Sequence, residues 1–272
     1  MYLLYCDESN MEERTGDFLL YAGISIPPSS TQILFEEIEK IRNYYKVSPD
    51  FSFKFNPGPS NLTHAEFINL KQAVLEKAEE HGVRLFAYVV LHDIARKTGL
   101  DEARRNGINA VLYHFDCYLN RKSAIGMALL DRFNDAGNQI DGHVREKVAF
   151  GVKGLPYSKE KRLKNLVGVH YSAIGQSHFC SLVDIIVGSL RFAINVHSRS
   201  QQDMEPTAKA LLQLLSPLFF REERDFTSTK VSKLGFQFSP KNVRLAHFRE
   251  KYIALHNFLL SNGIHCDQTI SE

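Results

Sequence analysis

Cysteine is scarce in this chain of 272 residues, and its four copies are scattered. Cys6, Cys117, Cys180 and Cys266 form no Cys-x-x-Cys pair and show no regular spacing. This pattern argues against a zinc ribbon and against a disulfide framework. We therefore expect reduced thiols and an intracellular protein.

Net charge is also small, because 33 lysines and arginines oppose 31 aspartates and glutamates. A balance of +2 gives no overall attraction to polyanions, so any such attraction must come from local clusters. The uncharged run from Phe18 to Phe35 contains Pro27 and Pro28, which favour a strand, a turn and a helix start over a membrane span. The apolar run Tyr2 to Cys6 has no basic leader. We expect a cytoplasmic protein with no membrane segment.

Composition is that of a globular protein, with 44% hydrophobic and 24% charged residues. Apolar runs predict strands, and amphipathic periodicity predicts helices. The predicted strands are residues 2–6, 18–26, 51–55, 84–91, 127–130 and 167–171, and the predicted helices are residues 33–45, 63–81, 101–120, a segment near Val144, 176–196, 208–219 and 244–260. Residues 222–240 are expected to be irregular. This order indicates one α/β domain with a helical C-terminal extension.

Three aspartates lie in apolar surroundings where an unpaired charge is costly. Asp7 and Asp131 each follow an apolar run, and Asp184 interrupts another. If the strands that precede Asp7 and Asp131 are parallel neighbours, the two carboxylates emerge at one edge of the sheet. Asp184 lies on a predicted helix whose small residues recur on the same side, at Ser177, Cys180, Ser181 and Gly188, together with Arg191. We expect this helix to aim Asp184 at the same edge.

Converging carboxylates without a zinc-like His or Cys pattern suit a hard cation, Mg²⁺ or Mn²⁺. Two such ions about 4 Å apart activate a water and stabilise the leaving oxygen in phosphodiester cleavage. Glu8 points to the opposite face if the strand continues through it, so it is a weaker candidate than Asp7.

Other interpretations of the same residues stay open. Asp131 also fits a helix cap or turn, in which case Asp135, or Asp93 at the end of the 84–91 strand, is the functional acid. Asp184 also fits a buried pair with Arg191. Five cations lie between Lys153 and Lys164, and they form a phosphate-binding feature only if they fold beside the carboxylates.

The segment Tyr5-Cys6-Asp7-Glu8-Ser9-Asn10 resembles the opening Tyr-x-Asp-Glu-Ser-Gly signature of the bacterial domain of unknown function 3800 family (DUF3800). Weaker blocks also fit: Gly23 in the second strand, the run from Phe51 to Pro57, the late Asp131, and Asp184 with Gly188 on a helix. Together they cover residues 2 to about 192. Asn10 departs from the usual Gly, and Ser52 stands where an acidic residue commonly precedes the Lys.

The resemblance implies a ribonuclease-H-like fold, with a mixed five-stranded sheet flanked by helices in residues 1–200. Residues 201–272 would be a helical extension packed on the same domain. It also implies Asp7, Asp131 and Asp184 as the metal-binding set, with Lys54 contacting a phosphate. Ser52 would then remove a possible fourth ligand.

The leading hypothesis is a nuclease that hydrolyses RNA or DNA with Asp7, Asp131 and Asp184 holding Mg²⁺ or Mn²⁺ and Lys54 as electrostatic helper. The alternative is a catalytically impaired module with the same fold that binds nucleic acid or regulates a partner. A third hypothesis is a protein-interaction module in which Asp184 only stabilises the core. The helices beyond residue 204 leave a homo-oligomer possible.

Overall fold

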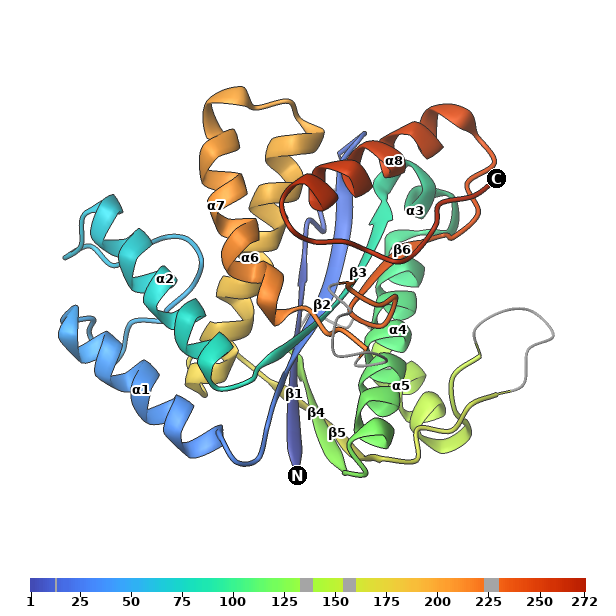
Figure 1. Cartoon of the computed structure of the whole chain (residues 1–272). Helices are drawn as coiled ribbons and strands as arrows, with labels where there is room; N and C mark the ends of the chain where they lie inside the picture. Colours follow the sequence, from blue (N-terminus) through green and yellow to red (C-terminus); the bar gives the residue numbers. More distant parts are fainter. Residues whose placement is uncertain (13, 133–138, 154–159, 223–229) are drawn as a thin grey trace.

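The computed structural model describes residues 1–272 except 13, 133–138, 154–159 and 223–229 (Figure 1). Its strands are β1 (Tyr2–Ser9), β2 (Phe18–Ile26), β3 (Arg84–Leu91), β4 (Gly126–Asp131), β5 (Leu166–Ser172) and β6 (Phe236–Ser239). Its α-helices are α1 (Thr31–Tyr44), α2 (His64–Glu80), α3 (His92–Thr98), α4 (Leu100–Arg121), α5 (Gln139–Phe150), α6 (His178–Ser198), α7 (Glu205–Leu215) and α8 (Ala246–Ser261).

One mixed sheet of six strands runs through the molecule in the order β5-β4-β1-β2-β3-β6. Strand β2 is antiparallel to both of its neighbours, and the pairs β1–β4, β4–β5 and β3–β6 are parallel. The α/β class is therefore confirmed, whereas the expected count of five strands is wrong. The expected hairpin of residues 2–6 and 18–26 is confirmed as β1 and β2.

Two segments differ from the sequence-based expectation. Residues 51–55 form no strand, although Phe53 is fully buried as the alternating aromatics suggested. Residues 222–240 contain β6, in which Phe236 and Phe238 are buried and the strand pairs with β3. The C-terminal region therefore supplies an edge strand as well as helices.

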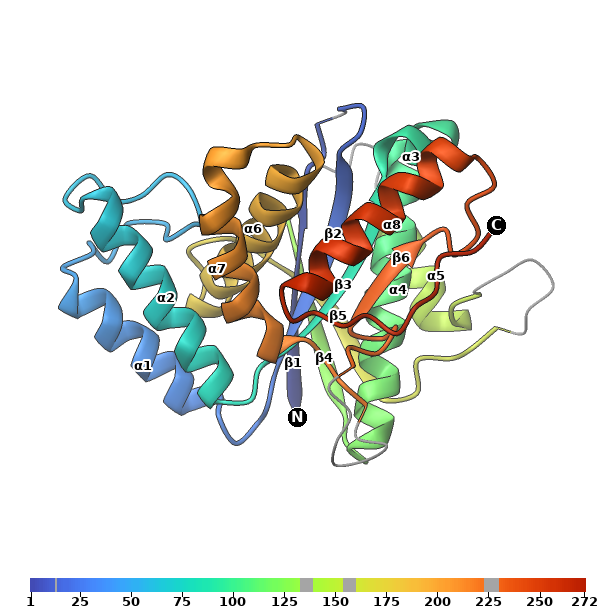
Figure 2. The same cartoon turned by 45° about the horizontal axis from the view of Figure 1, so that its top comes forward.

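Two hydrophobic layers cover the two faces of the sheet, because side chains alternate along each strand. Tyr5 and Leu129 pack in the layer that contains the buried residues of α1, α2, α6, α7 and α8, which we call the α6 face. Cys6 and Leu130 pack in the layer that contains α4 and α5, which we call the α4 face. Figures 1 and 2 show α6 and α7 on one side of the strands and α4 on the other.

Helix α6 is the one described helix that is long and apolar enough to cross a membrane, but 78% of its apolar window is buried inside the protein. Its buried residues pack against the sheet, α1, α2, α7 and α8. That burial is typical of the core helix of a soluble protein. The uncharged run from Phe18 to Phe35 forms β2, a turn and the start of α1, as expected.

Candidate functional site

Asp7 and Asp131 lie side by side at the ends of two parallel neighbours. Strand β1 pairs with β4 so that Cys6 is opposite Leu130, and the two aspartates are the next residues of their strands. Since Cys6 and Leu130 face α4, alternation directs both aspartates to the α6 face. The predicted edge-of-sheet arrangement of these two residues is therefore present.

Asp184 approaches the same place from α6. Its charge raises the pKa of both Asp7 and Asp131, which shows that the three carboxylates form one electrostatic cluster. We call Asp7, Asp131 and Asp184 the carboxylate cluster. Two strands that are remote from the helix in sequence thus meet it at one point.

Two carboxylates of the cluster accept a backbone N–H, and a third backbone N–H acts on Asp131. Asp7 Oδ1 accepts from Glu8 at 2.8 Å, and Asp184 Oδ2 accepts from Phe55 at 2.6 Å. The Arg132 N–H donates to the Ser172 carbonyl at 2.8 Å and also lowers the pKa of Asp131. The bonds to Asp7 and Asp184 orient these carboxylates and lower their pKa values, but they neutralise no charge.

Burial dominates the electrostatics of the cluster. Burial, followed by the charges of Asp184 and then Asp131, raises the pKa of Asp7 to about 8. Burial is also the largest cause of the raised pKa values of Asp131 and Asp184. Lys54 lowers both of these pKa values through its charge, and Arg191 lowers that of Asp184. Burial therefore outweighs the nearby positive charge in the pKa values of Asp131 and Asp184.

Lys54 is placed near the cluster by the irregular segment 51–56. Phe55 anchors this segment at both of its backbone groups, since its N–H bonds to Asp184 and its carbonyl accepts from Lys71 Nζ at 3.2 Å. The Lys71 ammonium also lies over the Phe55 ring, 4.3 Å from its centroid, and burial lowers the pKa of Lys71 to about 8.

Gly188 on α6 lets Phe55 approach the helix. A Cβ added to Gly188 would lie 2.5 Å from the Phe55 Cβ, a distance that real contacts do not show. The small residues of α6 were expected to bring the helix close to the sheet, and Gly188 instead accommodates the segment that carries Lys54. The roles of Lys71 and the Phe55 backbone were not predicted, because nothing in the local sequence pattern around either marks a contact with the cluster.

Glu8 lies on the opposite face, as alternation predicted. Its Oε2 is 2.9 Å from Arg104 Nε on α4, and both side chains are mostly buried. Burial raises the pKa of Glu8, and the Arg104 charge opposes that rise. Glu8 therefore belongs to an internal ion pair.

Asp93 also has a structural role. Its carboxylate accepts the Gly16 N–H at 2.8 Å and pairs with Arg96, with Lys251 nearby at 3.8 Å. Asp93 follows β3, and strand β2 lies between β3 and β1. Of the two alternatives, the geometry favours Asp131 as the neighbour of Asp7. Asp135 lies outside the described residues.

The alternative pairing of Asp184 with Arg191 is not made. Among the ion pairs of the described residues, none joins these two side chains, and the Arg191 guanidinium instead lies 5.9 Å from the centroid of the Phe55 ring. The buried pair that would have given Asp184 a purely structural function is therefore absent from the part of the chain that the structure describes.

The oxygens of the cluster suit a hard divalent cation, but they do not all lie within 4.8 Å of one another. Within the described ranges, the one group of three acidic or histidine ligands that close together is Glu37, Glu80 and His81. Those side chains satisfy each other, because His81 bonds to Glu37 at 2.8 Å and Lys77 pairs with both glutamates. That second group is a surface ion-pair network.

Two cations of the basic loop, Lys153 and Lys161, line a pocket that contains no member of the carboxylate cluster. A phosphate-binding role for the basic loop at the carboxylate cluster requires the loop to fold beside the cluster, and these two residues do not meet that condition.

No family model matches the chain, and no curated protein matches it. The chemistry of the site must be argued from its own residues.

Proposed function

We propose that this protein is a divalent-metal-dependent phosphodiesterase that hydrolyses nucleic acid at the carboxylate cluster. The observation that carries the proposal is the meeting of Asp7, Asp131 and Asp184 on one face, where no described lysine or arginine forms an ion pair with them. Buried carboxylates that repel one another cost free energy, and a bound divalent ion would remove that cost. Perturbed carboxylates of this kind are typical of functional sites.

Each residue has a role that follows from its position. Asp7, Asp131 and Asp184 would hold Mg²⁺ or Mn²⁺, which when bound activates water and stabilises the leaving oxygen. The backbone N–H of Glu8 fixes one oxygen of Asp7, and that of Phe55 fixes one oxygen of Asp184. The other oxygen of each carboxylate is left for a ligand. Lys54 would attract a phosphate of the substrate, since its charge already acts on Asp131 and Asp184.

The same observations support a finer assignment of the fold. A mixed sheet with one aspartate on the first strand, one on a later strand and one on a long helix agrees with what the resemblance to the domain of unknown function 3800 family implies. We therefore propose a ribonuclease-H-like domain acting in the cytoplasm. The scattered, reduced cysteines support that compartment.

The test is cleavage of end-labelled single-stranded RNA, single-stranded DNA, duplex DNA and an RNA–DNA hybrid, each with Mn²⁺, Mg²⁺ or EDTA. We expect metal-dependent cutting by the wild type and a loss of about 100-fold or more in Asp7→Asn, the effect of removing a group that stabilises transition-state charge. Asp93→Asn is the matched control, because Asp93 also follows a strand but lies outside the cluster. Equal cutting by Asp7→Asn and wild type would overturn the proposal.

A second candidate is a catalytically impaired module that binds nucleic acid or regulates a partner. Two observations favour it. The carboxylate oxygens of Asp7, Asp131 and Asp184 do not all lie within 4.8 Å of one another, and the exposed Ser52 supplies no carboxylate beside Lys54. This candidate predicts salt-dependent binding without turnover. No cutting by a well-folded wild type, together with such binding, would select it.

A further inference from the structure

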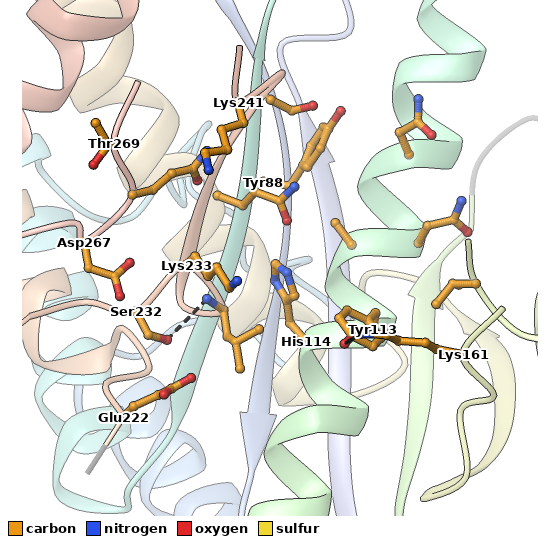
Figure 3. Close-up of a pocket in the computed structure, with 18 of the residues that line it drawn as sticks. Tyr88, Tyr113, His114, Lys161, Glu222, Ser232, Lys233, Lys241, Asp267 and Thr269 are labelled. Atoms are coloured by element: carbon orange, nitrogen blue, oxygen red, sulfur yellow. Dashed lines mark hydrogen bonds between the residues drawn. The ribbon is translucent and has the colours of Figure 1, made fainter. Parts of the chain in front are cut away.

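A second site lies on the α4 face, away from the carboxylate cluster. It is a pocket of about 910 Å³ between α4, β3, β6, the loops on either side of β6 and residues 267–269 (Figure 3). Pockets for small ligands and cofactors span about 300–1,000 Å³, so this one has room for a molecule of nucleotide size. None of its lining residues belongs to the carboxylate cluster.

The pocket is strongly basic although the chain is nearly neutral. Its lining includes five lysines and two carboxylates, and the lysines are Lys153, Lys161, Lys230, Lys233 and Lys241. One of the carboxylates, Glu222, is already paired with Arg121 at 2.8 Å. None of the five lysines forms an ion pair with a described residue. The pocket therefore concentrates positive charge that no described carboxylate pairs with.

The lysines surround one concavity. Figure 3 shows Lys233 and Lys241 on one wall and Lys161 with Tyr113 on the opposite wall. Lys161 Nζ bonds to the Tyr113 hydroxyl at 2.8 Å, which holds this ammonium at the wall formed by α4. Charges that converge from several sides suit a compact polyanion better than an extended strand.

The inner wall adds buried polar groups. His114 is only 4% exposed, and its ring bonds to Gln237 and to the Leu234 backbone. Its Nδ1 makes no hydrogen bond that meets geometric criteria with a described residue, and its side chain and Lys233 point toward each other. Burial, with the Lys233 charge, lowers the pKa of His114 to about 4, so the ring is neutral at physiological pH. Tyr88 beside it is also buried. An unpartnered, buried polar atom in a basic pocket is a free hydrogen-bonding position for a ligand.

We propose that this pocket binds a phosphorylated small molecule of nucleotide size. Ammonium groups on opposite walls match the several negative charges of a di- or triphosphate, and charge-assisted bonds to phosphate oxygens are strong. His114 Nδ1, the Asn109 amide nitrogen and the Gln237 amide offer neutral hydrogen bonds to the rest of the molecule, in addition to the bonds that Asn109 Oδ1 makes to His143 and Gln237 makes to His114. The site stands apart from the proposed nuclease chemistry, and its occupancy requires no divalent metal.

The test is isothermal titration of the full chain in EDTA with ATP, inorganic triphosphate, adenosine and a single-stranded 12-nucleotide DNA. We expect ATP and triphosphate to bind, adenosine to bind far more weakly, and the double variant Lys233→Glu/Lys241→Glu to lose at least about tenfold in affinity for ATP. The control is Lys40→Glu/Lys46→Glu, which makes the same charge change at exposed positions in and just after α1. Thermal melting confirms that each variant folds.

Three results would overturn the proposal: no binding of ATP or triphosphate by folded wild type, equal affinity in the two double variants, or binding of the oligonucleotide alone. The last result would assign the lysines to a nucleic-acid surface. Because the titration contains no divalent ion and the cleavage assay requires one, failure at this pocket and failure of the nuclease proposal are separate outcomes.

Discussion

The two faces of the sheet treat two adjacent acids in opposite ways. Asp7 and Glu8 are consecutive residues of β1, and alternation directs Asp7 to the α6 face and Glu8 to the α4 face. Burial raises the pKa of both. Glu8 meets Arg104 at 2.9 Å, whereas the neighbours of Asp7 are two further carboxylates. One acid is compensated inside the fold, and the other is not.

Under the proposed function, this contrast separates a structural acid from a functional one. A buried carboxylate with a fixed cation holds elements together and has little capacity left for a ligand. A buried cluster that no described cation pairs with destabilises the fold unless something binds it, which is why we propose a binding role for it. The same reasoning applies to the lysine pocket on the α4 face, where the uncompensated charge is positive.

The largest expected effect on stability is at Glu8, whose charge is paired with Arg104. Glu8→Gln removes the carboxylate charge nearest to the mostly buried Arg104, and we expect a loss of about 3 kcal/mol in the free energy of unfolding. The matched control is Asp101→Asn, because Asp101 also contacts Arg104, at 3.5 Å, but is exposed. That change should cost at most about 0.5 kcal/mol. Urea unfolding of both variants measures the difference, and equal stabilities would show that the Glu8–Arg104 pair is not structural.

A smaller change in the free energy of unfolding, this time a gain in stability, is expected for Asp7→Asn in EDTA. The folded-state pKa of Asp7, about 8, lies above the unfolded value of about 3.9, so the folded state binds the extra proton. Wild-type stability should therefore fall as pH rises from about 4 to 8, and the variant should lose this part of the slope. At pH 8 we expect Asp7→Asn to be more stable by on the order of 2 kcal/mol. Thermal melting across this pH range is the measurement, and a difference between the proteins that does not change with pH would contradict the prediction.

Sequence periodicity predicted the parts of this site that depend on regular structure. Alternation placed Asp7 and Glu8 on opposite faces, and the parallel pairing of β1 with β4 brought Asp7 beside Asp131. It could not predict β6, because four residues with two aromatics carry too little pattern to mark a strand. Nor could it identify Arg104 as the partner of Glu8, since that contact depends on how α4 packs across the sheet.

Residues 51–55 show how a local pattern can mislead. Their alternating phenylalanines are typical of a strand, and Phe53 is buried as a strand residue would be. However, the Phe55 N–H bonds to Asp184 and its carbonyl to Lys71, so these backbone groups do not enter the sheet. The long-range contact with the carboxylate cluster decides the conformation, and no short window of sequence contains it.

The smallest expected effect tests how Phe55 packs against Gly188 of α6. Gly188→Ala would place a Cβ 2.5 Å from Phe55 and push the segment that carries Lys54 away from α6, at a cost of about 1 kcal/mol or more. Gly142→Ala on α5 is the control, because a Cβ there meets no atom within 4 Å, and an alanine inside a helix should add about 0.5–1 kcal/mol of stability. Urea unfolding should therefore move the two variants in opposite directions. If metal-dependent cleavage also falls in Gly188→Ala but not in Gly142→Ala, the position of Lys54 contributes to the reaction. Unchanged cleavage in a destabilised Gly188→Ala would confine the Phe55 contact to packing and leave the carboxylates as the whole of the catalytic machinery.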